Sequence, residues 1–470
     1  MQLKPKGGLG NMIKHKRKGL SLKVIILLWV IGIAGQICWN LENQWFNMYV
    51  YKFFGYDMGT NIITYMVIFS AIATFISTFI FGTLSDRKGK RKPFICFGYI
   101  IWGLFTFLFG ITHKLNGVLV PWLMITIVVL ADSIMSFFGS MGNDSGFSSW
   151  TTDLLTEDSK GAIGIALAAQ PVIGTIAGTV VGGILVNAFG YTYFFLIAGA
   201  LVSIIGLISL FTMKDVPGIT PKVEGTFKKQ LFSAFNFKDF IKNKELVLVF
   251  TILATFFIGF NCFFNYIGNI FVYNYGFNEG NFGYVEGAGL ILAIIIMVII
   301  TMKVKKDRSP LMTLISILSE VLGLIVLTIV SKAKMYDSTN LLSAKNILLF
   351  IGVIIMGFGY VMFMSTIMVW AKSLYPEDKR GQIEGIRILA FVLIPMIFGG
   401  IISKIFIGLF GEVKSYVDST SGMLIEGEKV PNEALFIVAI VIMLITLVPL
   451  FFVSKLHKER KMLDENIQNR

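Results

Sequence analysis

Two apolar stretches of the sequence carry amide side chains at helical spacing. The first holds Gln36, Asn40, Asn43 and Asn47, at positions i, i+4, i+7 and i+11, with Trp39 beside them. The second holds Asn261, Asn265 and Asn269, which repeat every four residues. Residues at these spacings share one face of an α-helix. Because amides donate and accept hydrogen bonds, these faces, with Gln170 in a third stretch, could bind the hydroxyl groups of a sugar, or could join helices without a ligand.

Carboxylates interrupt the apolar stretches as well, and polar groups in such stretches often mark the path of a substrate. The candidates for coupling to a cation are Asp132, Asp144, Glu42 and Glu320. A buried carboxylate can take up and release a proton near neutral pH, and its oxygens can equally bind sodium. Asp132 is the first choice because it lies near the middle of its stretch, whereas Glu286 opens another stretch.

Helices that cross a membrane must position these side chains. Hydrophobic residues make up 55% of the 470 residues and charged residues only 15%, against about 25% charged residues in soluble proteins. A crossing helix needs about 20 mostly apolar residues. Twelve stretches qualify, near 22–50, 60–84, 93–113, 118–149, 161–188, 191–213, 245–274, 282–302, 309–331, 345–372, 383–410 and 434–454. We therefore predict an all-α integral membrane protein with twelve transmembrane helices, numbered spans 1 to 12.

The same composition argues against other classes of protein. A net charge of +13 would suggest nucleic acid in a soluble protein, but these cations lie in short runs between apolar stretches. Cys38, Cys96 and Cys262 all lie inside apolar stretches and indicate neither a disulfide framework nor a metal site. The sequence has no Gly-x-Ser-x-Gly motif and no phosphate-binding glycine loop. We expect no enzyme activity, no cofactor and no bound metal.

Lysine and arginine indicate the orientation, because they concentrate on the cytoplasmic side of membrane proteins. With the N-terminus inside, 32 of the 41 lysines and arginines fall on the cytoplasmic side and 8 on the outer side. Both termini are therefore expected in the cytoplasm. The first apolar stretch is too long for a signal peptide and is interpreted as an uncleaved span. A bias toward Lys, Ile, Asn and Phe suggests a bacterium with an AT-rich genome, and hence the cell membrane.

An internal repeat divides the chain. The segment from Trp150 to Gly161, after span 4, matches the segment from Trp370 to Gly381, after span 10, at an offset of 220 residues. Asp86-Arg87 matches Asp307-Arg308 in the same way, at an offset of 221. Two parallel six-helix repeats with a substrate site between them are a transporter architecture. The predicted domains are a six-helix bundle at 1–213, a cytoplasmic linker at 214–244, a second six-helix bundle at 245–454 and a cytoplasmic tail at 455–470.

The loop after span 2 reads Gly82-Thr-Leu-Ser-Asp86-Arg87-Lys88-Gly89-Lys90-Arg91-Lys92-Pro93-Phe94. This pattern resembles the signature of the major facilitator superfamily, and its ending resembles the glycoside–pentoside–hexuronide and sucrose cation symporters. The resemblance implies the major facilitator fold, a monomer, and a latch that stabilises the outward-open state. In that latch Gly82 and Gly89 allow close packing and a tight turn, and Asp86 faces the N-terminus of span 11. Arg87, with Arg91 as a further basic residue of the motif, pairs with Asp153 at the end of span 4.

Span 5 carries glycines four residues apart, Gly174, Gly178 and Gly182, which let helices pack closely. The row partly resembles a motif of drug–proton antiporters, but Thr179 stands where that motif has proline. Close packing alone also explains these glycines.

We therefore expect a secondary active transporter that imports a sugar or glycoside together with a proton or sodium. Transport would proceed by alternating access around a site near the middle of the membrane. The alternative is a proton-coupled efflux antiporter for drugs or metabolites on the same fold, with an apolar, Met- and Phe-lined cavity that holds one acid. The expected partners are a small-molecule substrate, the coupling ion and the lipid bilayer, with no nucleic acid.

Overall fold

The structure is a computed structural model, and it describes residues 20–156, 158–223, 225–233, 237–303, 308–375, 380–417 and 423–468. The first 19 residues lie outside these ranges. So do Asp307 and residues 376–379, so the second copy of each repeated loop is only partly described.

Long apolar helices make up nearly all of the described chain. Span 1 consists of α1 (Leu22–Asn40), η1 (Leu41–Trp45) and α2 (Phe46–Phe54), span 2 is α3 (Tyr56–Lys88), and span 3 is α4 (Lys92–Phe109). Span 4 consists of α5 (Pro121–Ser140), η3 (Met141–Phe147) and α6 (Ser148–Asp153), and α7 (Lys160–Thr212) contains spans 5 and 6. Span 7 consists of α10 (Lys244–Phe264), α11 (Ile267–Asn269) and η4 (Ile270–Asn274), and spans 8, 9 and 10 are α12 (Glu279–Lys303), α13 (Ser309–Lys332) and α14 (Ile347–Ser373). Span 11 consists of α15 (Arg380–Ile388), η7 (Leu389–Leu393) and α16 (Ile394–Phe410), and span 12 of α17 (Ala434–Ile445) and α18 (Leu447–Gln468). The segments η1, η3, η4 and η7 are π-helical turns, and η2 (Thr112–Leu115) and η5 (Ala344–Asn346) are 3₁₀ turns.

Eleven continuous helical stretches among the described residues are long and apolar enough to cross a membrane. One of them, α7, contains two spans, because Gly190 interrupts the helix with φ 78° and ψ 165°. Only glycine adopts this backbone conformation readily. Gly190 therefore separates span 5 from span 6 as a single-residue turn. The predicted all-α membrane fold with twelve spans is therefore confirmed.

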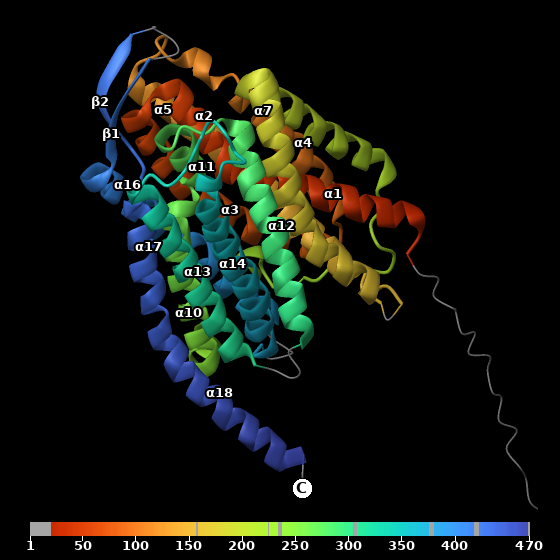
Figure 1. Ribbon diagram of the computed structural model, residues 1–470. Coiled ribbons are helices and arrows are strands. Elements are labelled where there is room, and N and C mark those ends of the chain that lie inside the picture. The colour runs from red at the N-terminus through yellow and green to blue at the C-terminus, as the bar shows by residue number, and fades with distance from the viewer. Residues whose placement is uncertain are drawn as a thin grey trace, which may run out of the picture.

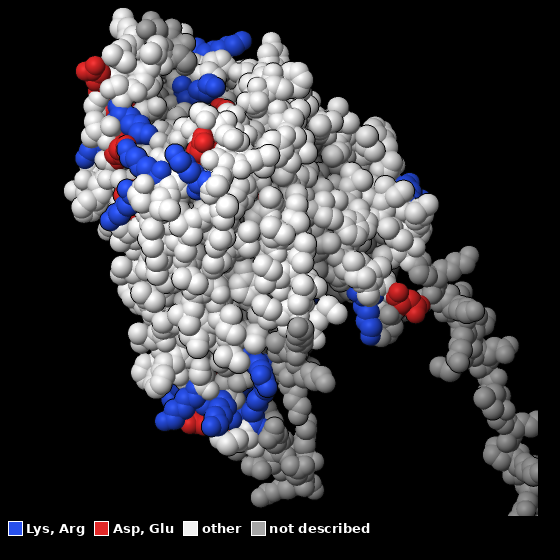
Figure 2. Space-filling view, viewed as in Figure 1, with Lys and Arg blue, Asp and Glu red and all other residues white. Residues whose placement is uncertain are grey.

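Figure 1 shows the N-terminal helices (α1–α7) and the C-terminal helices (α10–α18) as two groups that lie side by side. Helix α7 packs against α12, α3 against α16, and α2 against α11 where the groups meet. In Figure 2 lysine, arginine and acidic residues gather at the two ends of the molecule, and a broad belt between them is uncharged. This is the surface expected of a protein whose middle faces lipid.

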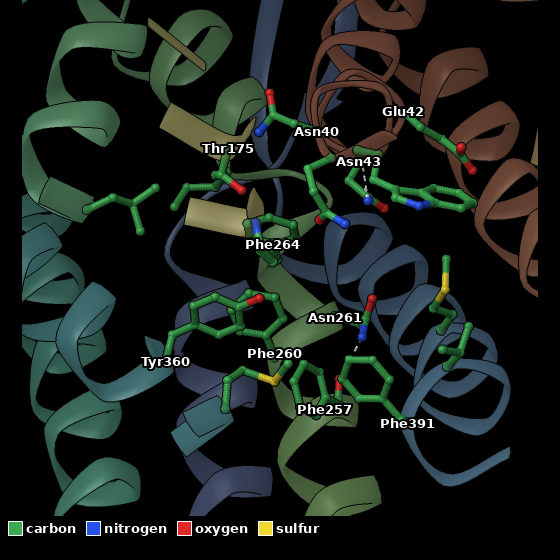
Figure 3. A pocket seen from close by; sticks show the side chains of 18 of the residues that line it. Asn40, Glu42, Asn43, Thr175, Phe257, Phe260, Asn261, Phe264, Tyr360 and Phe391 are labelled. Carbon is green, nitrogen blue, oxygen red and sulfur yellow. Dashed lines mark hydrogen bonds between the residues drawn. The ribbon is translucent and has the colours of Figure 1, made fainter. Parts of the chain in front are cut away.

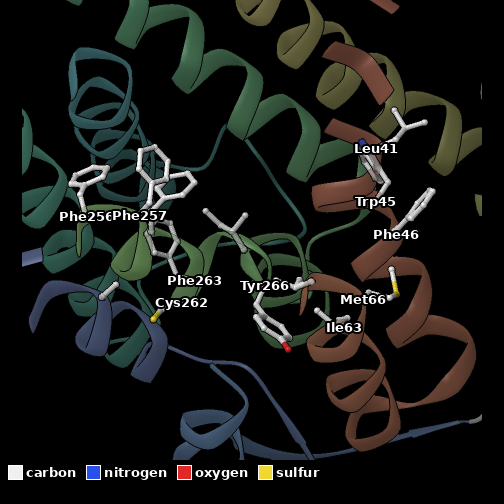
Figure 4. Close-up of a cluster of buried hydrophobic side chains, with 14 of the residues drawn as sticks. Leu41, Trp45, Phe46, Ile63, Met66, Phe256, Phe257, Cys262, Phe263 and Tyr266 are labelled. Atoms are coloured by element: carbon white, nitrogen blue, oxygen red, sulfur yellow. The ribbon is translucent and has the colours of Figure 1, made fainter. Parts of the chain in front are cut away.

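The buried core runs along spans 1 and 7, where the groups meet. Figure 4 shows Leu41, Trp45 and Phe46 of span 1 on one side, with Phe263 and Tyr266 of span 7 on the other. Trp45 is fully buried, and its indole N–H donates to the carbonyl of Gly178, 3.0 Å away. A buried indole needs such an acceptor, so this bond fixes span 1 against span 5.

The structure adds three features to the predicted organisation. Strands β1 (Glu412–Val417) and β2 (Leu424–Val430) form an antiparallel hairpin between spans 11 and 12. The residues predicted as a tail continue α18 as far as Gln468, and the linker contains α8 (Phe227–Ser233) and α9 (Phe237–Lys242). We call the end of the bundle that carries β1 and β2 the hairpin face, and the opposite end, with residues 86–92 and the linker helices, the linker face (Figure 1).

Candidate functional site

A cavity of about 470 Å³ lies between the two groups of helices. Its volume is that of an ordinary small-molecule site. Figure 3 shows side chains from both groups pointing into it. The N-terminal helices contribute Gln36, Trp39, Asn40, Glu42, Asn43, Ser70, Thr74, Asn143, Asp144, Pro171 and Thr175. The C-terminal helices contribute Phe257, Phe260, Asn261, Phe264, Ile267, Glu286, Leu290, Glu320, Val353, Met356, Gly357, Tyr360, Met364, Phe391, Val392 and Met396.

The N-terminal wall is polar and comes mainly from span 1. Asn43 donates its amide N–H to the Trp39 carbonyl at 2.7 Å, and Asn40 donates to Gln44 Oε1 at 3.2 Å and Thr179 Oγ1 at 3.1 Å. The buried Asn40 Oδ1 has no hydrogen-bond partner among the described residues. This oxygen lies against Gly178 of span 5, so the Asn40 amide joins span 1 to span 5 at the edge of the cavity.

The C-terminal wall is aromatic. The rings of Phe260 and Tyr360 are stacked at 4.7 Å and 14°, and Phe264 stacks on Phe260 at 4.5 Å. Phe391 meets Phe257 edge to face at 4.6 Å. Asn261 is the amide on this wall, and its Nδ2 donates back to the Phe257 carbonyl. The amount of phenylalanine in the sequence hid this wall, because 43 phenylalanines gave no reason to select these.

The glycine row of span 5 positions the polar wall. A Cβ at Gly174 would lie 2.3 Å from Gln36 Cβ, one at Gly178 2.4 Å from Asn40 Oδ1, and one at Gly182 2.7 Å from Trp45 Nε1. Real Cβ atoms do not approach so closely, so these three positions require glycine for span 1 to lie where it does. Close packing is thus sufficient to explain the row.

Five of the nine predicted substrate-binding residues line the cavity: Gln36, Trp39, Asn40, Asn43 and Asn261. Asn47, Asn265 and Asn269 instead lie nearer the hairpin face, where Asn47 donates to the Asn265 carbonyl at 2.8 Å and Asn269 donates to the Asn47 carbonyl at 3.2 Å. Gln170 donates to the Leu28 carbonyl at 2.8 Å. The side chains of Asn47, Asn269 and Gln170 thus hold helices together, and that of Asn265 donates back to the Asn261 carbonyl in its own helix.

Of the four predicted coupling acids, Glu42, Asp144 and Glu320 line the cavity and Asp132 does not. Asp132 is 1% exposed and interacts electrostatically with Glu42. Ser136, one turn after Asp132, donates to Glu42 Oε1 at 2.6 Å. Glu42 Oε2 and both Asp132 oxygens have no hydrogen-bond partner among the described residues. The two carboxylates therefore form a buried acidic pair with one member on the cavity wall.

Glu286, interpreted from the sequence as the opening of a span, is a cavity residue that was not among the predicted coupling acids. Its Oε1 accepts a hydrogen bond from Gln44 of span 1, and its Oε2 is buried without a partner among the described residues. Because α12 begins at Glu279, Glu286 lies two turns inside the helix and not at its opening. The misplaced start of span 8 concealed it.

The loop after span 2 pairs differently from the predicted latch. Asp153 pairs with Arg91, whose Nε lies 2.8 Å from Asp153 Oδ2 and whose Nη1 lies 2.7 Å from Asp86 Oδ1. Arg87, predicted to pair with Asp153, donates instead to the Gly225 carbonyl and to Gln230 Oε1 in the linker, each at 2.9 Å. Arg87 lies in the last turn of α3, before the helix ends, whereas Arg91 follows the turn that brings it toward Asp153.

Electrostatics and backbone geometry explain this arrangement. Burial alone would lower the pKa of the Arg91 guanidinium, but hydrogen bonds and charge from Asp153 and Asp86 raise it above its usual value. Gly89 ends α3 in the left-handed conformation, with φ 60°, as the predicted tight turn requires. Gly82 is less constrained, because the nearest atom to a Cβ there would be Ser145 Oγ at 3.8 Å.

Comparison with known proteins agrees with this geometry. The family model of the Major Facilitator Superfamily matches residues 43–337 and 308–467. A comparison with curated protein sequences finds no match.

Two solved transporters have a similar fold. The nucleoside transporter NupG superposes with a TM-score of 0.65 at 15% identity, covering 93% of this chain and 99% of its own. A bacterial homologue of the human lysosomal transporter Spinster, inward-facing and occupied, superposes with a TM-score of 0.60 at 13% identity, covering 92% of this chain and 96% of its own. At these identities the likeness shows the fold alone. The twelve-span chain, with its cavity between two groups of helices, is a membrane transporter that belongs to the major facilitator superfamily.

Proposed function

We propose that this transporter imports a sugar or glycoside together with a proton or sodium, across the cell membrane and by alternating access. The observation that supports this most directly is the contrast between the two cavity walls. Gln36 and Asn43 line one wall with amide groups that suit hydroxyls. Phe264 and Tyr360, at the two ends of the ring stack through Phe260, line the other wall with flat faces that suit the apolar C–H side of a sugar ring. Both termini and the linker face would lie in the cytoplasm, because most lysines and arginines fall on that side.

The aromatic wall also suits a nucleoside, which is an N-glycoside with a flat base. NupG, which has a similar fold, is a nucleoside transporter. A nucleoside therefore belongs in any panel of candidate substrates.

The pair Glu42 and Asp132 is the proposed coupling site. Two carboxylates that share a dry environment repel each other when both are charged, so the binding of one proton or one cation between them is favoured. Glu42 is on the cavity wall, so a change in its charge acts directly on the bound substrate. Asp144 and Glu320, also on the wall, are further candidates.

A proton-coupled efflux antiporter is the second candidate function. The Met and Phe side chains of the C-terminal wall, including Met364, Phe391 and Met396, favour it. Four acids on the wall, Glu42, Asp144, Glu286 and Glu320, count against the single acid that this alternative predicts.

Reconstituted liposomes test these functions. Uptake of labelled sucrose, lactose and uridine is measured under an inward proton gradient, an inward sodium gradient or no gradient. Accumulation of one compound under one gradient supports import and identifies the ion. No uptake of any compound, with export of a cationic dye under the proton gradient, moves the assignment to efflux.

Two variants assign the residues in that assay. Asn43→Ala should reduce uptake more than tenfold, while Asn61→Ala, in span 2 outside the cavity wall, should transport normally. Asp132→Asn should retain exchange of substrate across the membrane but lose gradient-driven accumulation. Accumulation that survives in Asp132→Asn would show that the cation binds elsewhere.

A further inference from the structure

The β1–β2 hairpin belongs to the C-terminal helices by sequence but also rests on the N-terminal helices. It joins span 11 to span 12, and β2 contacts both α16 and α3. In Figure 1 the hairpin lies at one edge of the bundle, above α16. The hairpin therefore touches both groups of helices where they meet on this face.

Glu428 of β2 binds the beginning of α3. Its Oε2 accepts the backbone N–H of Tyr56 at 2.7 Å and that of Asp57 at 3.4 Å. These are the first two residues of α3, whose N–H groups have no partner within the helix. A carboxylate at this end also interacts favourably with the helix dipole. Glu428 thus caps a helix of the other group.

Two further contacts support the same junction. The backbone N–H of Lys429 donates to Asp57 Oδ1 at 3.1 Å. The ring of Tyr416, on β1, lies 4.4 Å from the ring of Tyr56. The hairpin and the start of α3 are therefore joined by backbone, carboxylate and ring contacts together.

Lys414 of β1 binds the end of span 7. Its Nζ donates to the carbonyls of Tyr273 and Asn274, the last two residues of that span. A cation is favoured at the C-terminal end of a helix, where carbonyls lack partners. Tyr273 in turn donates its hydroxyl to the Met48 carbonyl of span 1 at 2.7 Å.

The two charged residues are opposite each other in the hairpin, because Lys414 pairs with Glu428 in the strand register. One side chain caps the start of a helix in the N-terminal group, and the other caps the end of a helix in the C-terminal group. We propose that the hairpin is a clamp that holds the two groups together on the hairpin face, and that Glu428 must leave α3 before the cavity can open there. The proposal rests on alternating access but not on the identity of the substrate.

Distances between spin labels on the hairpin face test the clamp without any substrate. Labels are attached at Val118→Cys in the N-terminal group and Leu342→Cys in the C-terminal group, which are 74% and 93% exposed. The native cysteines Cys38, Cys96 and Cys262 are buried. In the otherwise unchanged protein a short distance should dominate. In Glu428→Gln the fraction of molecules at a longer distance should rise at least threefold.

Glu426→Gln is the matched control, since Glu426 is an exposed glutamate on the same strand. It should give the same distances as the unchanged protein. Should Glu428→Gln elute as an aggregate, Glu428→Asp decides in its place, because it retains the charge but is too short to reach both N–H groups. A distance distribution in the Glu428 variant equal to that of Glu426→Gln overturns the clamp. A failed uptake experiment, in contrast, would bear on the substrate and leave these distances unaffected.

Discussion

The two ends of the bundle are held by different kinds of contact. On the hairpin face several polar contacts cross between the groups, as in Asn47 with Asn265, Lys52 with Glu279, and Glu428 with Tyr56. On the linker face the main polar clusters stay within one group. Arg91 joins Asp86 and Asp153 among the N-terminal helices, and Glu245 joins Trp370, His457 and Arg460 among the C-terminal helices.

This difference assigns two roles to polar contacts in the fold. A contact between the groups must break when they separate on that face, so it shifts the balance between conformations. A contact within one group can persist in every conformation, so it stabilises the group itself. The structure has the hairpin face closed, and its crossing contacts stabilise that conformation.

The largest effect is expected at the linker face. Arg91→Gln leaves the mostly buried Asp153 without its cation, at a cost on the order of 3 kcal/mol. The contact with Asp86 contributes less, because that carboxylate is 41% exposed and screened by solvent. Thermal unfolding of the purified protein should show a clear loss of stability, while the label distances on the hairpin face stay the same.

Arg87→Gln is the matched control for that change. Arg87 also donates two hydrogen bonds of 2.9 Å, but their acceptors lie on the linker and include no carboxylate. This variant should unfold close to the temperature of the unchanged protein. A shift in the hairpin-face distances in Arg91→Gln, without loss of stability, would contradict the division of roles.

An intermediate effect is expected where the groups touch through glycine. A Cβ at Gly183 of α7 would lie 2.7 Å from the Glu279 carbonyl oxygen and 3.3 Å from Gly283 Cα, both in α12. Gly183→Ala should therefore push the groups apart on the hairpin face, at about 1–3 kcal/mol. The label distances should lengthen, whereas Gly164→Ala, with nothing within 4 Å of its Cβ, should leave them unchanged.

The smallest effect is expected at the ion pair of Lys52 with Glu279. It crosses between the groups, but its atoms are 3.7 Å apart and the Lys52 side chain is 45% exposed. Exposed pairs contribute about 0–1 kcal/mol. Lys52→Gln should thus change the label distances only slightly, and high salt should remove even that difference. A shift as large as that of Gly183→Ala would mean that charge, not packing, closes this face.

The sequence predicted the spans well because hydropathy and length determine them, but it predicted the faces of span 1 only in part. Helical spacing places Asn40 and Asn47 on one face only if the helix is uninterrupted. The π-helical turn Leu41–Trp45 adds one residue between them, which rotates the following residues by about 100°. Asn40 therefore faces the cavity and Asn47 faces span 7.

Span 7 shows the same limit. Its helix is interrupted at Tyr266, with φ −119° and ψ 1°, between Asn261 on the cavity wall and Asn269 in the contact between groups. The interruption in span 1 has no proline or glycine that would reveal it in the sequence, and the one in span 7 has only Gly268, two residues after Tyr266. The hairpin was hidden for another reason, since a hydropathy pattern shows only a polar loop after span 11, whereas the alternating burial of Glu412–Val417 depends on what lies beneath it.

Gly190 makes the connection between spans 5 and 6 as short as a connection can be. Nothing lies within 4 Å of a Cβ at this position, so only the backbone conformation, and not crowding, excludes other residues. Two helices joined through one residue cannot slide along each other. Spans 5 and 6 must therefore move as one rigid unit during transport. An epitope tag inserted at this turn would be tolerated far less well than one in the linker.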